Sequence, residues 1–170
     1  QPDGFLHAEG SDSQNVHNTI EELNKKIESL CADLTDTVVF ITADHGHIDI
    51  QMDYFEENYP DFTKMLVRPV SIEPRGISFY VKDEFIPVFK ERFLKLFGSD
   101  YLIFSKEEVF QNKLFGPGNP HPNLTGIGDF IAPAIGTKTM FWNKTSPIFK
   151  SHHAGLTSQE IKIPLIVVEK

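Results

Sequence analysis

The stretch Thr37–Gly46, TVVFITADHG, decides the fold of this chain. Its first part, Thr37–Thr42, is apolar on both sides and rich in β-branched side chains, which is typical of a buried parallel strand. The strand ends abruptly in the polar residues Asp44 and His45. Because α/β folds place ligands just past the carboxyl ends of parallel strands, these two side chains are candidates for a functional site.

A long amphipathic helix is predicted before this strand, between Ser13 and Leu34. Its apolar side chains recur at alternating spacings of four and three residues, and Ser11 with Gln14 can form a capping box at its start. The apolar stripe consists of Val16, Ile20, Leu23, Ile27, Leu30 and Leu34. A helix followed by a buried strand is typical of an α/β sheet, so we expect this helix to dock on the sheet.

The rest of the chain alternates between further strands and helices. Strands are predicted at residues 77–81, 101–104, 127–131, 137–142 and 163–168, and helices at 83–97 and 106–113. The predicted fold class is therefore α/β, with helices on both faces of the sheet. We expect residues 1–50 and 148–170 to form the core of this domain. Residues 51–147 are expected to form a small inserted α+β subdomain.

Composition excludes several classes of protein. Of the 170 residues, 40% are hydrophobic and 15 are Phe, which is enough for a core and excludes wholesale disorder. The 16 basic and 24 acidic residues give a net charge of −8, which argues against binding to a nucleic-acid polymer. No apolar run approaches the roughly 20 residues that span a bilayer, so we expect no membrane segment in this chain. The single cysteine, Cys31, excludes an internal disulfide framework and favours a reducing, cytoplasmic location.

Three short clusters supply residue types that bind metal ions. They are Asp3 with His7, Asp44 with His45, and His152 with His153. Mixed carboxylate and imidazole ligands suit zinc, manganese or iron in sites that keep an open position for chemistry. Taken singly, the clusters can also be a solvated terminus, a turn after a strand and a pair of surface histidines. Gly46 would let the backbone approach a bound ion closely.

The order of these motifs resembles a known family. The stretch Thr42–Gly46 resembles the Asp-His-Gly metal motif of the alkaline phosphatase superfamily. Pro2–His7, which reads Pro-Asp-x-x-x-His, looks like an element of the type I phosphodiesterase/nucleotide pyrophosphatase branch of that superfamily. The stretch His153–Val167, HAGLTSQEIKIPLIV, is similar to the closing element of the same branch. The likeness runs through nearly the whole chain and implies an alkaline-phosphatase-like sheet, present here in part.

The resemblance implies a site for two divalent metal ions, zinc by preference, with manganese or iron as alternatives. Asp3, His7 and His153 match the ligands of one ion. Asp44 and His45 match two ligands of the other ion. The two cations would hold the attacking and leaving oxygens of a phosphoryl group and neutralise its charge.

Three further residues near these motifs have open roles. His152 is the alternative to His153 as a ligand, although the small pair after His153 fits the family motif better. His47 and Asp49 either orient the ligand imidazoles or simply cap the loop after the strand.

The resemblance also implies what this chain lacks. In the family, a Thr or Ser nucleophile and one more Asp ligand lie well before the element at Pro2–His7. We therefore expect a C-terminal portion of a longer enzyme, without its N-terminal half and inactive alone. The whole protein would hydrolyse phosphate diester or pyrophosphate bonds of a phosphate ester or nucleotide. The alternatives are another hydrolase or a phosphomutase of the superfamily, or a non-catalytic metal-binding protein.

Overall fold

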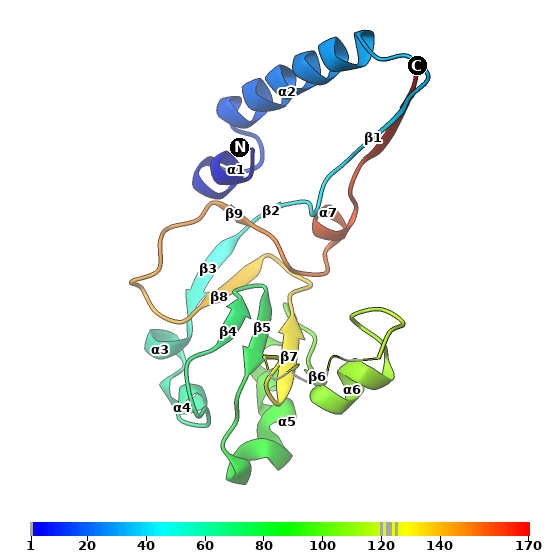
Figure 1. Ribbon diagram of the computed structural model, residues 1–170. Coiled ribbons are helices and arrows are strands. Elements are labelled where there is room, and N and C mark those ends of the chain that lie inside the picture. Colours follow the sequence, from blue (N-terminus) through cyan, green and yellow to red (C-terminus); the bar gives the residue numbers. More distant parts are fainter. Residues whose placement is uncertain (1, 120, 122–123, 125) are drawn as a thin grey trace. The chain divides into compact units, whose positions relative to one another are not determined.

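The structure is a computed structural model that describes residues 2–119, 121, 124 and 126–170 (Figure 1). The chain is a mixed α/β protein, as the sequence predicts. It divides into two compact units: unit 1 comprises Gln1–Ile50, Ile148–His153 and Ser158–Lys170, and unit 2 comprises Gln51–Pro147 and Ala154–Thr157. Among the helices described here, none has the length and apolar character needed to cross a membrane.

Unit 1 contains the predicted long helix and the strands around the candidate motifs. Its elements are α1 (Pro2–Glu9), α2 (Gln14–Ala32), β1 (Val38–Thr42), β2 (Ile48–Asp49), β9 (Ser151–His152), α7 (Ser158–Ile161) and β10 (Leu165–Glu169). β1 pairs with β10, and β2 pairs with β9; both pairs are antiparallel (Figure 1).

Helix α2 confirms the helix predicted between Ser13 and Leu34, but not its predicted cap. Ser13 is the N-cap, and its hydroxyl accepts a hydrogen bond from the backbone N–H of Val16 at 3.3 Å. The predicted capping box at Ser11 is therefore wrong. Of the apolar stripe, only Val16 is buried, whereas Ile20, Leu23 and Leu30 are exposed. The periodicity thus specifies the helix and its apolar face, but not what covers that face.

The prediction of a buried parallel strand at Thr37–Thr42 is wrong in two respects. β1 runs antiparallel to β10, with Val38 opposite Glu169 and Thr42 opposite Leu165. Both strands are also largely exposed, since Phe40 and Leu165 are 66% and 69% accessible. An apolar run indicates a strand that is suited to burial, but its partner and its covering layers depend on the rest of the fold.

Unit 2 consists of small sheets packed with helices. Its elements are β3 (Gln51–Tyr54), α3 (Phe55–Asn58), α4 (Pro60–Thr63), β4 (Ser71–Glu73), β5 (Gly76–Phe79), the 3-10 turn η1 (Asp83–Phe85), α5 (Ile86–Phe97), β6 (Phe104–Ser105), α6 (Lys106–Gln111), β7 (Phe130–Pro133) and β8 (Lys138–Phe141). Strands β4, β5, β7 and β6 form an antiparallel sheet in that order, and β3 pairs in parallel with β8.

Phenylalanine rings form the centre of unit 2. Helix α5 places Phe89, Phe93 and Phe97 four residues apart, so that all three lie on its buried face. Phe79 of β5 packs against the first two of these rings, with centroids 5.3 and 5.4 Å away. All four side chains are fully buried. This core holds unit 2 together without any disulfide, because the one cysteine, Cys31, is free.

Candidate metal centre

Helix α1 brings the first two candidate ligands together. Asp3 and His7 are four residues apart and share one helix face, with Asp3 Oδ1 3.5 Å from His7 Nε2. No helix is predicted here from the sequence. The signals were nevertheless present, because Pro2 stands at a first helical position, Asp3 in the first turn and His7 in the last.

Two further side chains converge on this pair of residues. Asp3, His7, His47 and His153 each offer one ligand atom, and these atoms all lie within 4.8 Å of one another. The group joins α1, the loop after β1 and the segment after β9, which are far apart in the sequence. It unites Asp3, His7 and His153, the three residues predicted to hold one ion, and adds His47.

The other predicted pair lies beside this group. The ring of His45 stacks on the ring of His153, with centroids 3.8 Å apart, and His45 Nε2 is 3.7 Å from Asp44 Oδ2. Asp44 is almost fully exposed. Among the described residues, Asp44 and His45 are not part of a convergent group of three or more ligand atoms. Two ligands of the second predicted ion are therefore present next to the first group without forming a complete site.

A cavity of about 530 Å³ in unit 1 is lined by residues of the convergent group and by the pair Asp44 and His45. Asp3, Asp44, His45 and His47 line it. Its other walls are mainly apolar and come from α2, β1 and β10. The cavity therefore combines metal-binding groups with apolar surface, as is usual in sites that bind small molecules.

His152 and Asp49 occupy supporting positions. His152 is buried in β9, its ring lies 4.7 Å from that of His7, and burial lowers its pKa to about 4. His152 Nδ1 accepts a hydrogen bond from the backbone N–H of His153 at 3.0 Å, and its ring is outside the convergent group. Asp49 accepts a hydrogen bond from the backbone N–H of Ser11 at 2.8 Å. This contact fits a residue that fixes a loop.

The charges of the group suit a cation. Burial alone would raise the pKa of Asp3, but the hydrogen bond with His47 and the nearby imidazoles outweigh it and leave that pKa below its usual value. Burial lowers the pKa of His47. These directions favour an ionised Asp3 carboxylate and a neutral His47 imidazole, and these are the forms that coordinate metal ions.

Ser151 organises the group, although nothing in the sequence analysis pointed to it. It is fully buried in β9. Its backbone carbonyl accepts a hydrogen bond from His7 Nδ1 at 2.9 Å, and its hydroxyl lies 3.0 Å from His47 Nδ1. The same hydroxyl donates to the carbonyl of Leu6 at 2.7 Å. One serine thus orients two imidazoles, which is a common arrangement around metal ligands.

Gly46 lets the loop after β1 approach another backbone segment closely. Its N–H donates to the carbonyl of Glu160 at 2.8 Å. A Cβ atom at this position would overlap the backbone carbonyl oxygen of Gln159 in α7. The glycine is therefore needed where the loop after β1 passes α7.

We expect Gly46→Ala to destabilise the protein by about 1–3 kcal/mol, because backbone atoms must move to accept the methyl group. Urea denaturation followed by circular dichroism measures this change. Gly4→Ala is the matched control, since a Cβ there meets nothing within 4 Å. Equal stability of the two variants would contradict the close approach of Gly46 to α7.

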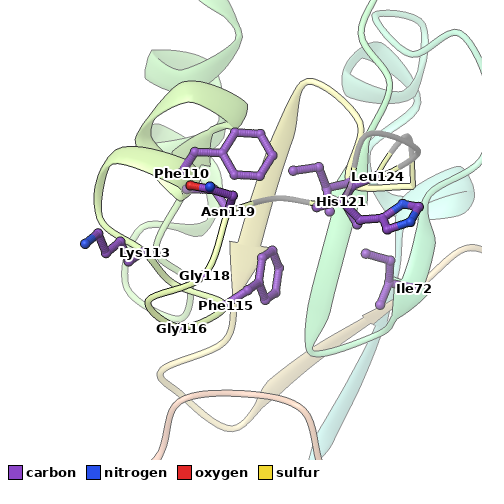
Figure 2. Close-up of a pocket in the computed structure, with 11 residues that line it drawn as sticks. Ile72, Phe110, Lys113, Phe115, Gly116, Gly118, Asn119, His121 and Leu124 are labelled. Atoms are coloured by element: carbon purple, nitrogen blue, oxygen red, sulfur yellow. The ribbon is translucent and has the colours of Figure 1, made fainter.

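A separate cavity of about 450 Å³ lies within unit 2. Figure 2 shows the rings of Phe110 and Phe115 on one side of it and Ile72 and His121 on the other. Most of its lining is apolar, and Lys113 is at its edge. The cavity contains no residue of the predicted metal site, so the candidate chemistry belongs to unit 1.

Comparisons with known proteins agree with the motifs. Residues 1–84 match the model of the family described as type I phosphodiesterase / nucleotide pyrophosphatase. A search of curated proteins finds no match. Among solved structures, human ectonucleotide pyrophosphatase/phosphodiesterase 5 matches with a TM-score of 0.72 and 16% identity, over 99% of this chain and 45% of that one.

Two further structures show the same fold. One is an inactive variant of the murine ectonucleotide pyrophosphatase/phosphodiesterase 5 in complex with AMP, with a TM-score of 0.68 and 16% identity over 97% of this chain and 44% of that one. The other is phosphonoacetate hydrolase from Sinorhizobium meliloti in complex with phosphonoformate, with a TM-score of 0.66 and 16% identity over 97% of this chain and 43% of that one. The chain therefore spans less than half the length of these structures. The predicted resemblance to the type I phosphodiesterase/nucleotide pyrophosphatase family is thus confirmed over residues 1–84, just under half of the chain.

Proposed function

We propose, from this family likeness and the geometry of unit 1, that the chain is the metal-binding C-terminal portion of a phosphodiesterase or nucleotide pyrophosphatase. One observation carries the proposal: the ligand atoms of Asp3 and His7, on α1, and of His153, which is far away in the sequence, lie within 4.8 Å of one another. A carboxylate and two imidazoles that meet in this way are a suitable ligand set for zinc, with manganese or iron as alternatives.

The proposed centre is binuclear. Asp3, His7 and His153 would hold one ion, and Asp44 and His45 would contribute two ligands to the other. The stacking of His45 on His153 supports neighbouring sites, because it brings the two ligand sets side by side. When bound, a pair of divalent cations neutralises the charge that develops on a phosphoryl group during its displacement.

The rest of the site has a simpler role. Apolar side chains from α2 and β10 line the cavity that exposes Asp3 and Asp44, and they would exclude water from a bound substrate. We propose a nucleotide or another phosphate ester as that substrate, a choice supported by the AMP complex of the murine relative.

A cytoplasmic location is also proposed, on the basis of the free cysteine Cys31.

The nucleophile and a further Asp ligand would come from a part of the protein that precedes this chain. The proposal is supported by the length of the relatives, since the chain spans 45% of human ectonucleotide pyrophosphatase/phosphodiesterase 5. We therefore expect the 170-residue chain to be inactive alone. A second candidate function is the hydrolysis of a phosphonate, which the likeness to phosphonoacetate hydrolase favours.

The test compares the 170-residue chain with the product of the whole gene that encodes it. Both are loaded with zinc and assayed on bis(p-nitrophenyl) phosphate, on a dinucleotide pyrophosphate and on phosphonoacetate. We expect the whole gene product to cleave the diester or the pyrophosphate when metal is present. The 170-residue chain should cleave neither. Cleavage of phosphonoacetate alone would favour the second candidate. A zinc-loaded whole product that is inert on all three substrates would overturn both.

A further inference from the structure

His47 lies at the centre of the ligand group, although it is outside the Asp-His-Gly motif. Its Nε2 atom is 3.0 Å from Asp3 Oδ1, closer than that of His7. The side chain of His47 is only 4% exposed. It is therefore more deeply buried than His7, the other imidazole that contacts Asp3. A buried polar ring that faces a carboxylate needs a partner for both of its nitrogens.

Ser151 fixes the proton on His47. The Ser151 hydroxyl carries a single hydrogen, which it donates to the carbonyl of Leu6. Its contact with His47 Nδ1 must therefore be one in which the imidazole donates. His47 Nδ1 thus serves Ser151, and Nε2 is the ring nitrogen that faces Asp3.

The same reasoning applies to His7. Its Nδ1 donates to the backbone carbonyl of Ser151, which can only accept, so Nε2 is the ring nitrogen that faces Asp3. The ligand atoms of His7, His47 and Asp3 thus lie within 4.8 Å of one another. Imidazole nitrogens and a carboxylate oxygen gathered this closely are suited to surround a single cation.

We propose that His47 is a fourth protein ligand of the ion held by Asp3, His7 and His153. This inference rests on the metal centre of the proposed function and extends it. The chain itself then supplies four ligand atoms to this ion, and a phosphoryl oxygen would enter as a fifth. Ser151 is the positioning residue that holds two of the imidazoles in the tautomer a metal ion requires.

The experiment measures zinc affinity by competition with a chromophoric chelator, and coordination by the visible absorption of the cobalt(II) form. In the 170-residue chain, His47→Ala is expected to weaken zinc binding about 10- to 100-fold. It should also reduce the intense absorption that four-coordinate cobalt gives. Ser151→Ala should weaken binding while keeping that absorption. His17→Ala is the matched control, because His17 is an exposed histidine on α2 that pairs with Asp12.

Each outcome decides between the hypotheses. If His47→Ala and the milder His47→Gln both keep the affinity and the cobalt spectrum of the wild type, His47 is not a ligand. If the affinity falls but the spectrum stays the same, His47 only positions Asp3, and the inference is again wrong. Failure of the wild-type chain to bind zinc would instead overturn the metal centre of the proposed function. Circular dichroism of the metal-free variants confirms that each is folded, and His47→Gln serves if the alanine variant is not.

Discussion

Replacing His7 with alanine is expected to weaken zinc binding by more than about 100-fold. Removing a group that only orients a ligand costs roughly 10- to 100-fold, and the loss of the ligand itself should exceed that range. His7 is well placed for this role, because Ser151 holds its Nδ1 and its Nε2 faces Asp3. The measurement is competition with a chromophoric chelator at neutral pH.

The control for this variant is again His17→Ala. His17 lies on α2 and pairs with Asp12 at 2.9 Å, outside the ligand group. Its replacement should leave zinc affinity unchanged. An equal loss in the two variants would mean that zinc binds the chain nonspecifically, and the assignment of His7 would then be wrong.

Phe79→Ala is expected to lower the free energy of unfolding by about 3–5 kcal/mol. This range applies to a large aromatic side chain removed from a well-packed core. Phe79 is fully buried, and four rings surround it at centroid distances of 5.3 to 5.9 Å. These rings belong to Phe55, Phe62, Phe89 and Phe93. They come from several elements of unit 2. Their positions are therefore fixed, and they cannot easily move to fill the space that the removed ring would leave.

Urea denaturation followed by the fluorescence of Trp142 measures the effect, because Trp142 packs against this core. Phe115→Ala is the matched control, since Phe115 is 65% exposed. That variant should change the stability by less than about 0.5 kcal/mol. Similar losses in both variants would contradict a core centred on Phe79.

The sequence predicted the features that depend on short-range patterns. The periodicity between Ser13 and Leu34 gave α2, and the apolar spacing at 83–97 gave α5. The grouping of Asp3, His7 and His153 was expected from the order of the family motifs. That order indicates which residues meet, but not the geometry in which they meet. Each of these signals is contained in a few neighbouring residues or in one known motif.

The features that depend on tertiary partners could not be predicted. β1 is apolar on both faces, but nothing within it specifies β10 as an antiparallel neighbour. Ser151 is one serine among many in the sequence, and only the folded chain shows that it contacts His7 and His47. The close approach of Gly46 to the backbone of Gln159 also cannot be read from either stretch of sequence. In each case the deciding contact joins residues that are more than a hundred positions apart.

The pairing of β1 with β10 also affects how the chain behaves in solution. Among the described residues, neither strand pairs with a third, so each has an outer edge of backbone N–H and C=O groups that no other strand covers. Exposed apolar side chains such as Phe40 and Leu165 flank these edges. Edges of this kind are templates for intermolecular strand addition. Self-association is therefore expected as the concentration rises, and titrations of the isolated chain need dilute samples.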